Sequence, residues 1–179
     1  MKALSIAAAF VFALSVSACN QTSSSQKTAD SATSATADTT AKVAAVVPDS
    51  DNVDKVYTSY IALKNDLVKT DAKAAKKSAA ELENALSAVK GCDEAATFAK
   101  KIGATDDIVS QRISFLTLSK DVITLVKGNK AGKETAYVTF CPMANEGKGG
   151  YWLSEIKEIK NPYYGSDMLE CGEVKEELK

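Results

Sequence analysis

Apolar residues recur at intervals of three and four along residues 51–128, and this period most constrains what the chain can fold into. Asp51 can cap a first helix, and Thr105 can cap a last one that ends near Gly128. Two further helices lie between the first and the last, and Gly91 and Gly103 suit their C-terminal ends. The apolar stripes are Val53, Val56, Tyr57, Tyr60, Ile61, Leu67 and Val68; Ala75, Ala79, Leu82, Leu86 and Val89; Ala95, Phe98 and Ile102; and Ile108, Phe115, Leu118, Val122, Leu125 and Val126. Four amphipathic helices joined by short turns predict an all-α fold, an antiparallel four-helix bundle.

The period changes in the C-terminal part of the chain. Residues 135–141 are rich in β-forming residues and alternate in polarity, which predicts one short strand. Glycines and prolines from Pro142 onward interrupt any longer element. About half of the aromatic residues lie in this part, so we expect residues 135–175 to form an irregular Cys-, Met- and aromatic-rich lid on the bundle. The folded helical domain with its lid then spans residues 51–179.

The N-terminus has the pattern of a secretory signal. A short apolar run from Ala3 to Val16 follows Lys2 and ends in Ser17-Ala18-Cys19. The run is too short to span a bilayer comfortably, and it ends in small residues, as cleaved signals do. The ending resembles the bacterial lipobox, which implies a lipoprotein signal peptide over residues 1–18 and a lipid on Cys19. The alternative is plain secretion with cleavage after Ala18.

Residues 19–50 form a predicted linker between this anchor and the folded domain. The segment consists mainly of Ser, Thr, Ala, Gln and Asp, with no large apolar residue before Val43. Such a composition cannot bury enough surface to offset the entropy of ordering the chain. We therefore expect a flexible, lipid-anchored tether and a location in the cell envelope, facing the periplasm, with the membrane as a partner through Cys19.

Charge and histidine content exclude several classes of function. The formal net charge of -1 provides no basic footprint for nucleic acid, so no nucleic-acid partner is expected. The chain contains no histidine, which removes Ser-His and Cys-His nucleophiles and His-rich zinc sites. No pair of acidic residues stands out as a general acid and base. We predict that the protein is not an enzyme and has no catalytic residues.

Sulfur-containing residues are the candidate site. If Cys19 carries lipid, the thiols of Cys92, Cys141 and Cys171 remain, and the odd count leaves one of them unpaired. Cys141 and Cys171 can close a disulfide in an oxidising compartment. Alternatively, Cys141 with Met143 and Met168 with Cys171 each place two sulfur atoms on one face, and the two pairs together suit Cu(I). The sequence leaves both readings open.

Arg112, Phe115 and Ser119 share one face of the last predicted helix. An arginine on an apolar stripe needs a partner. It either organises backbone carbonyls or a carboxylate of the C-terminal part, or extends its charged end to solvent at the edge of the bundle.

These residues, taken together, resemble a known family, the domain of unknown function 3347. The motifs are Arg112-x-x-Phe115-x-x-Leu118-Ser119, Cys141-Pro142-Met143-Ala144, Trp152-Leu153-Ser154, Asn161-Pro162-Tyr163-Tyr164-Gly165 and Met168-Leu169-x-Cys171-Gly172. The resemblance extends from about Asp51 to Val174. It implies a helical domain found in small bacterial envelope lipoproteins and appended to periplasmic adaptor subunits of heavy-metal efflux pumps. Many members have a polar residue or His where this chain has Phe140, so the resemblance implies one candidate metal ligand fewer here, which weakens the metal reading.

Two functions follow as expectations. The first is a periplasm-facing lipoprotein that binds or passes Cu(I) through Cys141, Met143, Met168 and Cys171, linked to metal efflux or homeostasis. The second is a non-catalytic structural or interaction domain with a Cys141–Cys171 disulfide. Its exposed aromatic residues would dock an efflux-pump adaptor, a metallochaperone or another envelope protein. Arg112, Phe115, Ser119, Trp152, Asn161, Tyr163 and Tyr164 are the expected structural and interaction residues.

Overall fold

The structure is a computed structural model that describes residues 50–129 and 135–179. Its elements are helices α1 (Ser50–Val68), α2 (Ala72–Ser87), α3 (Asp93–Gly103) and α4 (Ile108–Asn129), strand β1 (Ala136–Cys141), the short turn α5 (Ala144–Gly147), strand β2 (Gly150–Ser154), a 3₁₀ helix η1 (Gly165–Met168) and strand β3 (Glu173–Leu178). Residues 1–18, Cys19 and the rest of the predicted linker up to residue 49 lie outside the described residues. None of the helices in the described part is long and apolar enough to cross a membrane.

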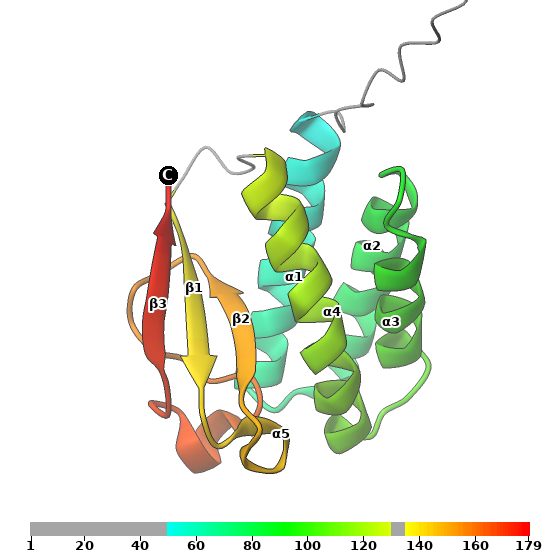
Figure 1. Ribbon diagram of the computed structural model, residues 1–179. Helices are drawn as coiled ribbons and strands as arrows, with labels where there is room; N and C mark the ends of the chain where they lie inside the picture. Colours follow the sequence, from blue (N-terminus) through cyan, green and yellow to red (C-terminus); the bar gives the residue numbers. More distant parts are fainter. Residues whose placement is uncertain (1–49, 130–134) are drawn as a thin grey trace, which may run out of the picture. The chain divides into compact units, whose positions relative to one another are not determined.

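The four predicted helices are present and pack as the 3.6-residue period requires. Each helix contacts the next one in the chain, and α4 also contacts α1 (Figure 1). Asp71 caps α2, since its side chain accepts a hydrogen bond from the backbone N–H of Ala74 at 2.9 Å. The side chain of Asp107 accepts the N–H of Ser110 at 2.9 Å, so Asp107 and not Thr105 caps α4.

The all-α prediction is wrong, because the C-terminal part forms a three-stranded antiparallel sheet in the order β2-β1-β3. In the pairing of β1 with β2, Tyr137 lies opposite Ser154 and Cys141 opposite Gly150. β3 pairs with the other edge of β1, and the register of this pairing shifts between Val138 and Thr139 of β1. β3 has the sequence EVKEEL, which shows no regular apolar alternation, and the strand is mostly exposed. Its pairing with β1 therefore depends on backbone hydrogen bonds.

The sheet shares the helices' core, so it is not an irregular lid. It lies beside α4 and α1, with β2 contacting α4, while α2 and α3 lie on the other side of these two helices (Figure 1). Phe115 of α4 stacks on Tyr60 of α1 at a centroid distance of 5.2 Å. The hydroxyl of Tyr60 shares a hydrogen bond with Ser119 at 2.8 Å and accepts the N–H of Leu153 in β2 at 3.2 Å. This buried polar contact fixes the sheet's position on the helices.

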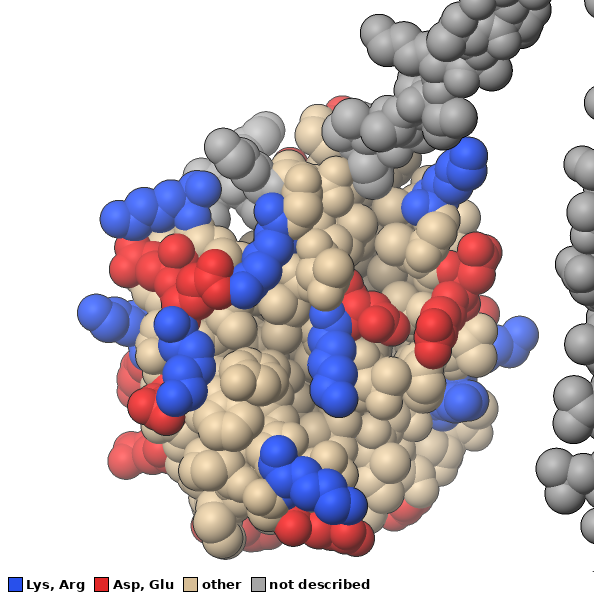
Figure 2. All heavy atoms as spheres, in the orientation of Figure 1, with Lys and Arg blue, Asp and Glu red and all other residues tan. Residues whose placement is uncertain are grey.

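The surface carries charges of both signs. Figure 2 shows lysine and arginine side chains interspersed with aspartate and glutamate on the face that carries the sheet and α4. On that face neither sign forms a continuous patch, in keeping with the formal net charge of -1.

Candidate functional site

Cys141 and Cys171 meet at one end of the sheet. Cys141 is the last residue of β1 and is fully buried. Cys171 follows η1, is partly exposed, and donates its backbone N–H to the carbonyl of Met168 at 3.1 Å. The two Sγ atoms are 2.7 Å apart although 30 positions separate the residues in the chain. The structure therefore brings together the cysteines of both readings.

Asn161 organises the loop that carries Cys171. Its side chain is fully buried, donates to the carbonyl of Cys171 at 2.8 Å and accepts the N–H of Tyr163 at 2.8 Å. Its backbone N–H bonds to the carbonyl of Leu169 at 2.9 Å. These three bonds hold both ends of the loop, so Asn161 sets the place of Cys171 opposite Cys141.

The pair is a weak nucleophile when it is reduced. The hydrogen bond with Cys141, together with burial, raises the pKa of the Cys171 thiol above its ordinary value. The thiolate is the reactive and metal-binding form of cysteine, and a raised pKa makes it scarce at neutral pH. The geometry thus suits a disulfide, or a metal ion that displaces the proton, better than nucleophilic catalysis.

Met143 and Met168 lie at the rim of this site. Met143 follows Cys141 closely in the chain, and Met168 closely precedes Cys171. The two methionines expose 51% and 41% of their surface, respectively. Two thiolates bound to one tetrahedral ion, each at about 2.3 Å, lie about 3.8 Å apart. The observed sulfur separation of 2.7 Å is shorter, so the pair must open before it can hold an ion. Within the described ranges, no group of three or more Cys, Asp and Glu side chains is placed to hold a metal.

Arg112 binds backbone carbonyls, as one of its two sequence readings predicts. Its Nε donates to the carbonyl of Pro162 at 3.0 Å. Its Nη2 donates to the carbonyl of Leu67 at 3.1 Å and to Oγ1 of Thr70 at 3.0 Å. Arg112 therefore links α4, the end of α1 and the loop before η1.

The aromatic residues of the motifs are mostly part of the core. Trp152 and Tyr163 are buried and meet edge to face at a centroid distance of 5.8 Å. Phe115 packs against Tyr163 at 5.9 Å, and the Tyr163 hydroxyl donates to the carbonyl of Tyr151. Trp152 and Tyr163 therefore cannot serve as exposed docking residues. Tyr164 is half-buried, and its hydroxyl donates to the carbonyl of Met143 at 2.6 Å.

Lys64 and Glu155 form a buried ion pair that was not predicted from the sequence. The Nζ of Lys64, whose side chain is 0% exposed, lies 2.7 Å from Oε2 of Glu155, which follows β2. Asn65 bonds to both side chains, at 2.7 Å to Lys64 and 2.9 Å to Glu155. Burial lowers the pKa of Lys64, and hydrogen bonds from Lys64 and Asn65 outweigh burial and lower that of Glu155. The spacing of Lys64 from Tyr60 and Leu67, four and three positions away on the apolar stripe, was the available signal.

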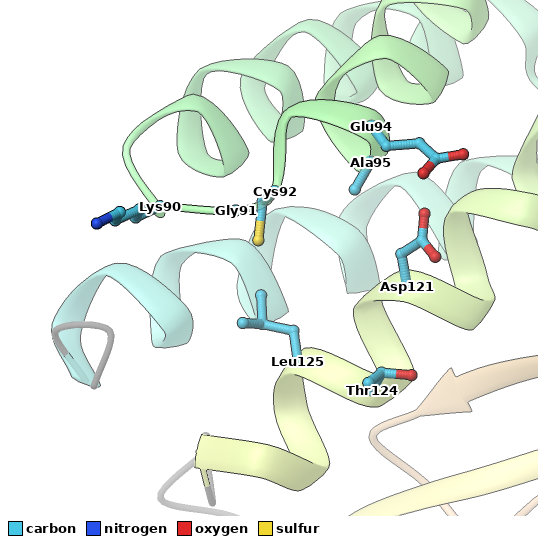
Figure 3. A pocket seen from close by; sticks show the side chains of 8 residues that line it. All are labelled: Lys90, Gly91, Cys92, Glu94, Ala95, Asp121, Thr124 and Leu125. Atoms are coloured by element: carbon cyan, nitrogen blue, oxygen red, sulfur yellow. The ribbon is translucent and has the colours of Figure 1, made fainter. Parts of the chain in front are cut away.

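Cys92 lies apart from the cysteine pair, in a cavity of about 320 Å³ between α3 and α4 (Figure 3). Its sulfur points toward Leu125, while the carboxylates of Glu94 and Asp121 lie close to each other and Lys90 points away. Burial, with Asp93 and Asp121 nearby, raises the pKa of the Cys92 thiol, which is therefore protonated and unreactive at neutral pH. All three described thiols are free in the structure, and Cys92 is the one that lies outside the Cys141–Cys171 contact.

Comparison with known proteins bears on the helical part of the chain. Residues 56–134 match a family model described as a protein of unknown function (DUF3347). The match includes the motif from Arg112 to Ser119 and excludes the cysteine pair. No curated protein and no solved structure matched the chain. The resemblance drawn from the motifs is thus confirmed over α4 and most of α1 to α3, where residues 56–134 match the DUF3347 family model.

Proposed function

We propose that the protein is a non-catalytic interaction domain of the bacterial cell envelope, held at a membrane through lipidated Cys19. In this proposal a Cys141–Cys171 disulfide secures the C-terminal sheet. An efflux-pump adaptor or a metallochaperone is the partner that the family resemblance suggests. The single observation that carries the proposal is the 2.7 Å separation of the two Sγ atoms.

The disulfide has a physical purpose in this fold. Cys141 ends the central strand, and Cys171 immediately precedes the turn into β3, so a bond between them closes the loop that contains β2 and η1. A loop of about thirty residues corresponds to roughly 3–4 kcal/mol in the chain-entropy model. The Gly- and Pro-containing segment between the cysteines has short elements only, so the disulfide would constrain a part of the chain that secondary structure holds weakly.

The oxidation state of the cysteines provides the direct test. Protein purified from the periplasm without reductant is expected to have a mass lower than that of the reduced protein by two hydrogen atoms. Alkylation of the denatured protein before reduction is expected to label Cys92 alone, and alkylation of the denatured protein after reduction is expected to label Cys141 and Cys171 as well. Peptide mass spectrometry locates the labels.

Cys92→Ser is the matched control, because it removes the thiol that lies outside the pair. This variant should retain the mass difference of two hydrogen atoms, while Cys141→Ser should abolish it. Complete labelling of Cys141 and Cys171 before reduction would contradict the disulfide.

Cu(I) binding by the reduced pair is a second candidate, favoured by the convergence of two thiols with Met143 and Met168 at the rim. Thiolate and thioether sulfur are soft ligands that suit Cu(I). Cys141 and Cys171 would supply the thiolates, and the exposed methionines can turn toward them because they are not packed in the core. A metal at this site and the disulfide exclude each other.

The copper proposal predicts one Cu(I) per reduced chain. In a titration against a chromogenic chelator of moderate affinity, the reduced protein should compete for one equivalent. Replacement of both Cys141 and Cys171 by Ser should remove this competition, whereas Cys92→Ser should leave it unchanged. Competition that survives loss of both paired cysteines would place the metal elsewhere and end the copper proposal.

A further inference from the structure

A cleft of about 470 Å³ lies between the N-terminal half of α4 and the two loops next to the cysteine pair. One wall comes from Val109, Ile113 and Leu116, which share an outer face of α4 at spacings of four and three. The opposite wall comes from the turn Ala144–Gly147 and from Tyr163 and Tyr164. Ligand sites have this size range and a mostly apolar lining.

The helix wall is unusually apolar for a solvent-facing surface. Val109 and Ile113 are 58% and 62% exposed, although α4 already buries Phe115, Leu118 and Val122 on its inner face. Scattered apolar residues on a surface need no explanation, but adjacent ones that line a concavity indicate a binding surface. The second apolar stripe of α4 therefore lacks a cover among the described elements.

Arg112 supplies a positive charge at the same cleft. Its three hydrogen bonds go to two backbone carbonyls and one hydroxyl, which are all neutral acceptors. Among residues 50–129 and 135–179 no carboxylate forms an ion pair with this guanidinium. Asp167 lies beyond ion-pair distance and acts on the pKa of Arg112 only through its charge. These bonds use Nε and both hydrogens of Nη2, so Nη1 is the group of Arg112 that can donate hydrogen bonds to a ligand carboxylate.

The loop wall is held in a strained conformation. Asn145 and Glu146 have φ angles of 54° and 57°, in the left-handed region that non-glycine residues rarely adopt. Backbone strain of this kind tends to gather at ligand-binding sites. The backbone N–H of Gly149 bonds to the carbonyl of Ala144 at 2.9 Å, and Tyr164 bonds to Met143 at 2.6 Å. These bonds keep the wall in place before any ligand arrives.

We propose that this cleft binds a small amphiphilic carboxylate of the fatty-acid class. The apolar chain lies along Val109, Ile113 and Leu116 against Tyr163, and the carboxylate accepts hydrogen bonds from Arg112. A concave site of this volume encloses a single chain, whereas a membrane surface is flat and would leave the cleft empty. This inference goes beyond the proposed function and does not depend on it.

Calorimetric titration with sodium decanoate below its micelle concentration tests the proposal. The full chain carries Cys19→Ser, which removes the proposed lipid. The protein then needs no detergent that could compete for the cleft. We expect saturable binding with one decanoate per chain and amide chemical-shift changes centred on Arg112, Ile113 and Tyr164. Uncharged 1-decanol should bind at least tenfold more weakly, because it cannot pair with the guanidinium. Equal binding of decanol and decanoate, or no saturable binding, would overturn the proposal.

Ile113→Glu is the decisive variant, since the side chain is exposed and the change places a negative charge beside the carboxylate without disturbing the core. It should weaken decanoate binding at least tenfold. Ile156→Glu makes the same substitution at an exposed isoleucine outside the cleft and should leave the affinity within twofold. If both variants weaken binding equally, the ligand binds elsewhere and the cleft is not the site.

Discussion

Replacement of Glu155 by Ala is expected to lower the free energy of unfolding by about 3 kcal/mol, since it leaves the ammonium of Lys64 buried without its carboxylate. Lys64 is 0% exposed, and within residues 50–129 and 135–179 the side-chain partners of its Nζ are Glu155 and Asn65. Glu155 is 30% exposed, so the cost should fall at the lower end of the range known for broken buried pairs. The effect is large because the pair joins α1 to the end of β2.

Urea denaturation of the single and double variants measures this effect. Lys64→Met combined with Glu155→Leu should recover most of the lost stability, because it removes both charges together. Glu158→Ala is the matched control. It removes the carboxylate of a largely exposed pair, with Lys160 at 2.8 Å, and should cost less than about 1 kcal/mol. If Glu155→Ala costs no more than this control, the Lys64–Glu155 pair does not hold the sheet.

Reduction of the proposed Cys141–Cys171 disulfide is expected to lower the free energy of unfolding by about 3–4 kcal/mol. For a domain of this size the melting temperature should fall by on the order of 10 °C. The loss arises mainly in the unfolded state, whose chain is no longer closed into a loop, so the reduced native state should keep its secondary structure. Thermal unfolding followed by circular dichroism, with and without reductant, measures the difference.

The variants separate this effect from a general action of the reductant. The double variant Cys141→Ser with Cys171→Ser should melt near the reduced wild type and should not respond to reductant. Cys92→Ser should still respond, because Cys92 lies in a separate cavity between α3 and α4. A wild-type protein whose melting temperature does not change on reduction would argue that the pair is not oxidised.

The helices could be predicted from sequence and most of the sheet could not. The 3.6-residue period of α1 to α4 is a local property, and glycines and acidic caps mark the helix ends. The first strand was predicted because its residues favour β-structure. β3 was not predicted because it carries four charged residues and buries little apolar surface. Its pairing depends on backbone groups that every residue has. The same pairing makes the C-terminal part a layer of the fold.

The candidate site, like the fold, could be predicted only in part from the sequence. Cys141, Cys171 and the two methionines could be selected from their residue types, but nothing local shows that the thiols meet across 30 positions or that the methionines stay at the rim. Asn161 was marked only by the family resemblance, and the fold shows that its role is to position the loop. The partner of Lys64 lies 91 positions away, beyond any local pattern.

The sequence by itself determined that four amphipathic helices form and that soft sulfur is the notable chemistry. Only the tertiary structure decided that a sheet completes the core, that the two thiols face each other and that α4 exposes a second apolar stripe beside Arg112. The physical reason is the range of the interactions. Helix period and capping act between residues three or four apart, whereas strand pairing and contacts between distant side chains exist only once the whole domain has packed.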